Sequence, residues 1–574
     1  MQRIYRQMGW ASVATFVSAA VVAVGLSFSP APVQAAFELP AGEKITNVPA
    51  IPRAMPIKEA YELYDPKIGK NFDVKNFWLR ADLRVRPEMR NQTCFGSNMA
   101  GSAGACNARN STTGANGARG VQNDQFTQQM TRLGIGYDVS PDVNFYMELI
   151  NSTSWGANSE LGNGTAAGAA GGVKDPSLNH GTVGVRAAYM LVRNFAGVQG
   201  LSVKAGRQYV IFGNHSLFGH FDWANTGFSH DGIMLNYSTK SFDTYLGWFR
   251  TSEGDMTQGA AVGSVSTNAL GSAHGGGRTG DADMFIFYNQ IKSVPGFLIE
   301  PYYILYNNAG TSSSSGGNTQ LNAAGGIGTP KHSNQVRHTV GNRIEMRKGN
   351  FDATNEIVYQ FGAMGDQVGT AADGTSDHQR SIHINAWATR NWIGYTYYQS
   401  AWKPRLAVNL DYASGDGRAQ CNGATGGAHA GSSTGTVGRC VSANTFENLF
   451  PTNHIHMGYM DVQAWKNMMS PSVNFQARPT KDDHIEIWGT SLNLANKEDN
   501  WYRGSQGAYV YSKVGNTKKH IGDELDVAYT HMFMDGKLAF QAAYGHLFAG
   551  GYIAENLGTS RDQDWAYAQL WLNF

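Results

Sequence analysis

Hydrophobic and polar residues alternate along most of this chain, most clearly over residues 78–90. The apolar face of that stretch consists of Leu79, Ala81, Leu83, Val85, Pro87 and Met89. The polar face consists of Arg80, Asp82, Arg84, Arg86, Glu88 and Arg90. A period of two is typical of a β-strand, because its successive side chains point to opposite faces. The stretch is longer than an ordinary globular strand of about 5–6 residues.

The same period recurs to the end of the chain and predicts about 18 strands, an even number as in single-chain bacterial outer-membrane barrels. We expect 391–402 to be a connection, longer and more aromatic than the other turns. The predicted strands are 77–90, 124–138, 143–153, 182–193, 201–210, 231–238, 241–251, 282–291, 297–307, 336–347, 351–362, 380–390, 403–413, 461–476, 484–493, 521–533, 537–548 and 563–574.

Two kinds of connection alternate between these strands. The short ones carry turn residues and are 140–142, 238–241, 292–296, 348–350, 479–483 and 535–537. The long ones are rich in Gly, Ala, Ser, Asn and Thr and are 91–122, 152–181, 252–281, 308–335, 363–379, 414–460, 494–520 and 549–562. Short periplasmic turns with long extracellular loops indicate an all-β, antiparallel transmembrane barrel.

Both ends of the chain agree with export to the bacterial outer membrane. Residues 1–35 have a basic start, an apolar centre and small residues up to Ala35, which predicts a cleaved signal peptide rather than a membrane helix of about 20 apolar residues. The last strand ends at Phe574, which resembles the signal that barrel-assembly machinery recognises. We therefore predict a signal peptide (1–35), a periplasmic or lumen-plugging segment (36–76) and a barrel (77–574) surrounded by outer-membrane lipid.

Composition narrows the function classes. The 45 Lys and Arg residues nearly balance the 44 Asp and Glu residues, which argues against a nucleic-acid partner that needs a basic surface. The four cysteines form two sequence-local pairs, and export places them in an oxidising compartment. We predict the disulfides Cys94–Cys106 and Cys421–Cys440, each within one long loop.

Catalysis and metal binding have little support in the sequence. No Ser/His/Asp arrangement can be placed together from the sequence. Local histidine pairs such as His454 with His456 and His215 with His220 supply fewer ligands than typical metal sites use. We therefore predict no enzyme activity, no cofactor and no metal site.

The charged face of the first strand is the main candidate for chemistry. It carries Arg80, Asp82, Arg84, Arg86, Glu88 and Arg90, and we add Arg207, Arg343, Arg347 and Arg405 as pore-lining candidates. Rings of Arg can select anions in a pore. The alternative is that inward charges pair across neighbouring strands and only solvate and stiffen the barrel. For the first strand as a unit we favour an anion-attracting wall.

Several motifs together resemble the alginate-export family of outer-membrane porins, over roughly residues 77–574. They are Gly206-Arg207-Gln208-Tyr209-Val210-Ile211-Phe212-Gly213, His220-Phe221-Asp222-Trp223, His230-Asp231-Gly232, Leu410-Asp411-Tyr412-Ala413-Ser414-Gly415-Asp416, Phe446-Glu447-Asn448-Leu449-Phe450-Pro451-Thr452-Asn453-His454, Gly458-Tyr459-Met460-Asp461, Trp465-Lys466-Asn467 and Gly522-Asp523-Glu524-Leu525-Asp526. The resemblance implies an 18-stranded barrel that passes an anionic polysaccharide through an arginine-lined, loop-gated lumen. It assigns that lining to Arg80, Arg84, Arg86, Arg90, Arg207, Arg343 and Arg347.

Four hypotheses about function follow. The first is an outer-membrane channel for anionic solutes that exports an anionic polysaccharide such as alginate. The second, of nearly equal weight, is a general or small-anion porin for nutrient uptake. The third is a structural or adhesive surface barrel, and the fourth a barrel that encloses a periplasmic redox partner. The partners that these hypotheses imply are periplasmic export or redox proteins.

Overall fold

The computed structural model describes residues 74–96, 123–155, 183–252, 282–308, 335–366, 380–417, 421–422, 439–440, 442–504, 506, 508–510, 512–513 and 515–574. The predicted signal peptide, nearly all of the segment 36–76 and large parts of several predicted long loops lie outside these residues. In the part of the chain that is described, no helix is long and apolar enough to cross a membrane.

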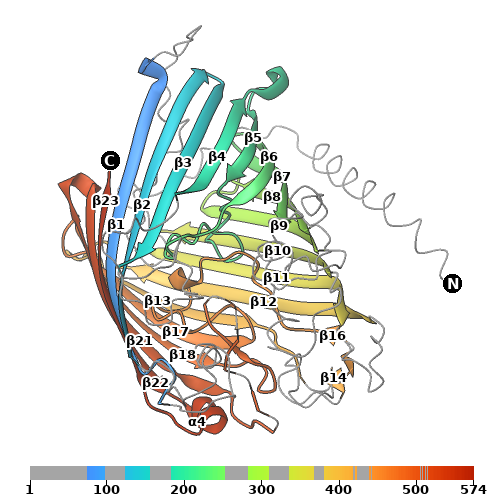
Figure 1. Ribbon diagram of the computed structural model, residues 1–574, viewed down its shortest axis with the longest axis vertical. Helices are drawn as coiled ribbons and strands as arrows, with labels where there is room; N and C mark the ends of the chain where they lie inside the picture. Colours follow the sequence, from blue (N-terminus) through green and yellow to red (C-terminus); the bar gives the residue numbers. More distant parts are fainter. Residues whose placement is uncertain are drawn as a thin grey trace, which may run out of the picture.

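A closed antiparallel barrel dominates the described residues (Figure 1). β1 (Phe77–Asn91) pairs with β2 (Asn123–Ser140) on one side and with β23 (Gln563–Asn573) on the other, which closes the sheet. Among the described residues, 18 strands form this barrel. The others are β3 (Val143–Ser154), β4 (Gly184–Arg193), β5 (Leu201–Gln208), β6 (His230–Ser238), β7 (Phe242–Ser252), β8 (Ala282–Ile291), β9 (Phe297–Asn308), β10 (Gln335–Lys348), β11 (Phe351–Asp366), β12 (Arg380–Thr396), β13 (Arg405–Ala413), β17 (Met468–Ala477), β18 (Asp483–Asn493), β21 (His520–Phe533) and β22 (Leu538–Ala549).

The remaining elements are short. β16 (Ser442–Ala443) runs parallel to β12 and joins the same sheet. The other short elements are β14 (Cys421–Asn422), β15 (Arg439–Cys440), β19 (Trp501–Tyr502), β20 (Ala508–Val510), η2 (Val74–Asn76), η4 (Phe195–Gly197), η6 (Asn453–Ile455), η7 (Met534–Gly536) and α4 (Gly551–Leu557).

Along the barrel strands, exposed apolar side chains face outward and buried charged side chains face inward. Outward residues such as Leu79, Ile357 and Ile393 are 56–58% exposed, whereas the inward Arg84 and Glu524 are at most 2% exposed. Apolar side chains outside and polar side chains inside are the pattern of an outer-membrane barrel. The fold predicted from the alternation is therefore confirmed.

Two predicted boundaries are wrong by more than four residues. β17 begins at Met468 rather than at 461, because 461–467 turn into the lumen; Asp461 and Asn467 have φ values of 58° and 44°, which interrupt an extended strand. β12 continues to Thr396 instead of ending at 390. The aromatic residues that suggested a connection there continue the alternation, with Trp392 buried inside and Ile393 exposed outside.

Candidate functional site

The connection between β5 and β6, residues 209–229, crosses the lumen, and we call it the first inserted loop. Its Ser216 hydroxyl accepts a 2.8 Å hydrogen bond from Arg390 on β12. Its Trp223 carbonyl accepts a 3.1 Å hydrogen bond from Arg84 on β1. β1 and β12 are not neighbours in the sheet. The loop therefore spans the space between distant parts of the wall.

Arginines on β1 bind the backbone of the first inserted loop. The Arg84 guanidinium donates to the carbonyls of Asp222 and Trp223 and, over 3.2 Å, to Asn225 Oδ1. Arg86 donates to the Trp223 carbonyl over 2.8 Å, and its guanidinium carbon lies 3.6 Å from the centroid of the Trp223 ring. Charged donors make stronger hydrogen bonds than neutral ones. These two arginines thus fix the loop to the wall.

The Asp222 side chain adds an ionic attachment. Its carboxylate lies 3.0 Å from Arg132 Nη1 on β2 and 3.4 Å from Arg186 Nη2 on β4. Burial acts to raise the pKa of the Asp222 carboxyl, but Arg132 and His220 outweigh it and hold that pKa well below its ordinary value. Asp222 is therefore an anion, and its side chain binds the loop to β2 and β4. Its backbone carbonyl adds a contact with β1.

Residues 444–467, between β16 and β17, form a second inserted loop, which donates hydrogen bonds to inward carboxylates. The backbone N–H of Met460 donates to Glu524 over 3.1 Å, and that of Tyr459 donates to Asp526 over 3.1 Å. The Tyr459 hydroxyl donates to Glu486 over 2.9 Å. The three carboxylates lie on β18 and β21. The wall thus accepts these hydrogen bonds from the second loop, whereas Arg84 and Arg86 donate to the first.

The two inserted loops also bind each other. The Phe450 N–H donates to the Leu217 carbonyl and the Gly219 N–H donates to the Phe450 carbonyl, each over 2.9 Å. The rings of Trp223 and His454 are stacked, with centroids 3.7 Å apart and planes 6° apart. Both loops therefore form one packed layer inside the barrel. We call this layer the constriction.

Two histidines of the second inserted loop are buried in the constriction. Burial lowers the pKa of both His454 and His456. His456 Nε2 donates to the Asn214 carbonyl over 2.6 Å, and His454 Nδ1 lies 3.0 Å from Asp461 Oδ2. In the described ranges, no group of three or more His, Cys, Asp or Glu is placed to hold a metal ion.

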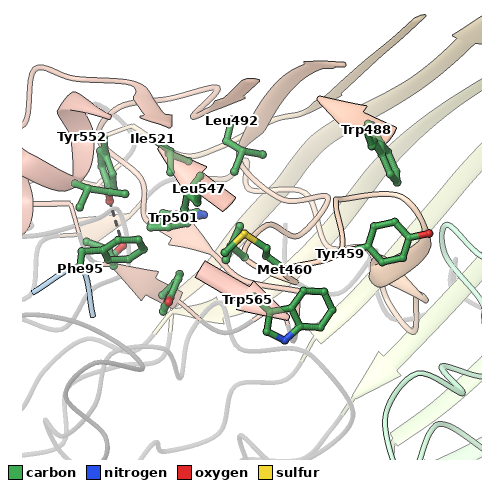
Figure 2. Close-up of a cluster of buried hydrophobic side chains, with 14 of the residues drawn as sticks. Phe95, Tyr459, Met460, Trp488, Leu492, Trp501, Ile521, Leu547, Tyr552 and Trp565 are labelled. Carbon is green, nitrogen blue, oxygen red and sulfur yellow. Dashed lines mark hydrogen bonds between the residues drawn. The ribbon is translucent and has the colours of Figure 1, made fainter. Parts of the chain in front are cut away.

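Apolar packing fixes the second inserted loop from its other side (Figure 2). Tyr459 and Met460 belong to a buried cluster that includes Trp488 of β18 and Trp565 of β23. The same cluster extends to Phe95, which follows β1 and is fully buried. Burying large aromatic side chains is strongly stabilising. The constriction is therefore held by apolar contacts as well as by charges.

The sequence-predicted residues of β1 fall into a cluster of ion pairs. Arg80 Nη2 lies 3.6 Å from Asp82, Arg86 Nε lies 2.7 Å from Glu88, and Arg90 Nη2 lies 3.2 Å from Glu88. We define the arginine sector as β1 together with the charged groups that this cluster reaches. Its six guanidinium groups and four carboxylates are Arg80, Arg84, Arg86, Arg90, Arg132 and Arg186, and Asp82, Glu88, Glu148 and Asp222.

Arg343, Arg347 and Arg405 also point into the barrel, but far from β1. Arg343 and Arg347 both contact Glu345 of β10, at 2.6 and 2.5 Å. Arg405 of β13 contacts Asp352 of β11 at 2.6 Å. Cross-strand and same-strand pairing of this kind is what the alternative interpretation of the inward charges predicted. The structure does not bring these three arginines together with the arginine sector.

The prediction that Arg207 lines the lumen is wrong. It lies opposite Asp231 in the β5–β6 register and pairs with it at 2.8 Å, with 41% of the Arg207 side chain exposed. It shares its face with Ala205, whose partner Ile233 is 44% exposed on the outward surface. The alternation of Leu201, Val203 and Ala205 already indicated this face.

Sequence reasoning missed Arg132 and Arg390, although both are fully buried. The alternation around Arg132 predicts that it faces the lumen, because Leu133 and Ile135 lie on the other face. It also missed that the connection 209–229 is an inserted loop, because that segment lacks the Gly/Ala/Ser bias of the other long loops. The signal was its own motif, His220-Phe221-Asp222-Trp223, which is dense in aromatic and charged residues.

The predicted disulfides are partly within the described residues. Cys94 is disulfide-bonded, but Cys106 lies outside the described residues. Cys421 and Cys440 lie directly opposite each other in the β14–β15 register. The two pairings therefore stay predictions.

Comparison with known proteins gives one family. A family model described as alginate export matches residues 180–567. No curated protein matches the chain.

Similar solved structures include three outer-membrane proteins of Pseudomonas aeruginosa. OccK8 (OprE) is 10% identical with a TM-score of 0.45, covering 87% of this chain and 98% of that chain. OccK9 (OpdG) is 10% identical with a TM-score of 0.45, covering 87% and 99%. OccD3 (OpdP) is 12% identical with a TM-score of 0.42, covering 92% and 100%.

Proposed function

Because this chain belongs to the alginate-export family of outer-membrane barrels, we propose that its channel passes anionic solutes past the constriction and that its physiological substrate is an anionic polysaccharide. The outer-membrane channel itself follows from the family and the barrel. The choice of anions rests on the arginine sector.

One observation carries the proposal. The arginine sector has an excess of two positive charges beside the loop that crosses the lumen, since six guanidinium groups face four carboxylates. Two of its arginines keep contact with solvent: the side chains of Arg80 and Arg90 are 17% and 31% exposed. Fixed positive charge at a narrow point of a pore attracts anions and repels cations.

Reversal potentials in planar bilayers test the choice of ion. In a KCl gradient, we expect the wild-type channel to prefer chloride. Arg80→Gln and Arg90→Gln each remove one charge and should lower that preference. Arg207→Gln is the matched control, because Arg207 lies on the outward face and should leave the preference unchanged. A cation-selective wild-type channel would contradict the proposal.

A second measurement separates a polysaccharide channel from a general porin. Oligouronates added on the periplasmic side should reduce the KCl conductance, whereas neutral oligosaccharides of equal length should not. A channel that both kinds of oligomer leave unblocked would instead support uptake of small nutrients. That alternative is favoured by the extent of charge pairing, since Arg343, Arg347 and Arg405 all contact carboxylates.

A further inference from the structure

Three short turns at one end of the barrel form a continuous edge, which we call the basic rim. They are the connections 348–350, 397–404 and 478–482. The strands that they join are consecutive in the sheet, and β10, β11 and β12 lie side by side in Figure 1. The Thr396 N–H donates to the Asn350 carbonyl and the Arg478 N–H donates to the Trp402 carbonyl, each over 2.8 Å. Short turns of an outer-membrane barrel face the periplasm, so the basic rim lies on that side.

The basic rim has an excess of positive charge. It contains Lys348, Lys403, Arg478 and Lys481, against one acidic residue, Asp482. Asp482 lies 3.9 Å from Lys481, and both side chains are at least 35% exposed. An exposed pair of this kind is weak, because water screens it. Four basic groups and one carboxylate leave an excess of three positive charges.

The neighbouring carboxylates are held by other groups. Asp483, which begins β18, accepts a 2.6 Å hydrogen bond from the Tyr529 hydroxyl and lies 2.7 Å from His531 Nδ1, both on β21. Glu345 and Asp352 face the lumen, where inward arginines pair with them. The positive charge of the basic rim is therefore open to a further anionic group.

Exposed aromatic side chains lie beside the basic rim on the lipid-facing surface. Phe351 is directly opposite Tyr395, two residues from the outward Ile393. The Tyr395 ring lies 4.8 Å from that of Phe351 and 4.7 Å from that of Tyr397, between ring centroids. Phe351, Tyr397 and Trp402 are each more than half exposed. Aromatic girdles mark the headgroup level of a membrane, so the basic rim lies at the headgroups of the periplasmic leaflet.

Basic side chains at this level suit lipid phosphates, because their apolar stems lie along the hydrocarbon while their charged ends reach the headgroups. A polysaccharide in the lumen would instead meet the inward face of these strands, which carries Arg347 and Arg405. We propose that the basic rim binds the phosphate groups of anionic phospholipids, with Lys348 and Arg478 in its two outer turns. This site does not depend on which solute the channel passes.

Native mass spectrometry of the full chain in a neutral detergent tests the proposal. Phosphatidylglycerol and zwitterionic phosphatidylethanolamine are titrated separately, and we expect phosphatidylglycerol to bind more tightly. Each basic residue near an anionic headgroup strengthens binding by about fivefold. Lys348→Gln combined with Arg478→Gln should therefore weaken phosphatidylglycerol binding by roughly 25-fold and leave phosphatidylethanolamine binding unchanged. Heat-modifiable migration in gels confirms that each variant still forms a closed barrel.

Two matched variants isolate the charge of the basic rim. Lys348→Arg combined with Arg478→Lys keeps the charge and should keep the wild-type affinity. Lys518→Gln combined with Lys519→Gln removes the same charge from two exposed residues at the opposite end of the barrel, and should also keep it.

Four results would overturn the proposal. The two lipids bind equally to the wild-type chain, the Gln variant of the basic rim keeps the wild-type affinity, or the Lys518 and Lys519 variant loses as much affinity. In the fourth, an oligouronate displaces phosphatidylglycerol from the wild-type chain, which would mean that the basic rim collects the polysaccharide instead.

Discussion

Replacing Arg84 by methionine should release the first inserted loop from the wall. Methionine keeps a similar length but removes every hydrogen bond that the guanidinium donates to the carbonyls of Asp222 and Trp223 and to Asn225. Each bond from a charged donor contributes about 1.5–3 kcal/mol. Because Arg84 is itself buried, we count only two bonds at the lower end, which gives about 3 kcal/mol.

A loss of about 3 kcal/mol lowers the ratio of docked to undocked loop by roughly a hundredfold. Single-channel recording in planar bilayers measures this change. The wild-type channel should show one stable conductance, whereas Arg84→Met should show frequent transitions to a higher level as the loop leaves the constriction. A gel assay for barrel closure confirms that the variant has folded.

Two further variants separate loop release from loss of charge. Arg84→Lys keeps the charge but cannot reach several acceptors at once, so it should show some transitions with unchanged ion preference. Arg207→Met, on the outward face, should behave as the wild-type channel does. If a folded Arg84→Met channel keeps the wild-type conductance and its stability, then the Arg84 contacts do not hold the loop and the reasoning fails.

Two other predictions concern the second inserted loop. Gly458→Ala should loosen it, because Gly458 has a φ of 88° and a Cβ there would lie 2.2 Å from Glu524; the backbone alone costs about 1–3 kcal/mol. Limited proteolysis should cut this variant faster than Gly489→Ala, whose added Cβ meets nothing within 4 Å, and equal rates would contradict the prediction. Burial lowers the pKa of His456 below its ordinary value of 6.5. The neutral imidazole therefore stabilises the loop above that pH, and this contribution is lost as the pH falls and the imidazole becomes protonated. Conductance transitions should therefore increase below about pH 6.5 in the wild type. If His456→Gln shows an increase of the same size, then protonation of His456 is not the cause of the pH dependence.

Charged groups on the inner wall of the barrel fix both inserted loops in the constriction, although the chain as a whole is nearly neutral. The wall binds the first loop through guanidinium groups and the second loop through the carboxylates Glu524 and Asp526. Backbone carbonyls carry partial negative charge and backbone N–H groups partial positive charge, so in these contacts each backbone group meets a wall group of the opposite sign. The arginines of β1 thus have a structural task in addition to any effect on passing ions.

The sequence by itself determined the barrel, because the alternation of side chains along a strand is local and can be recognised without knowing which strands lie beside it. It also placed Arg84 and Arg86 inside, since both lie opposite a regular apolar face. The tertiary structure alone decided what those arginines contact. Their partners in the first inserted loop are more than a hundred residues away in the sequence. No local pattern specifies which carbonyl a guanidinium meets across a lumen, because that depends on how a whole loop packs against distant strands.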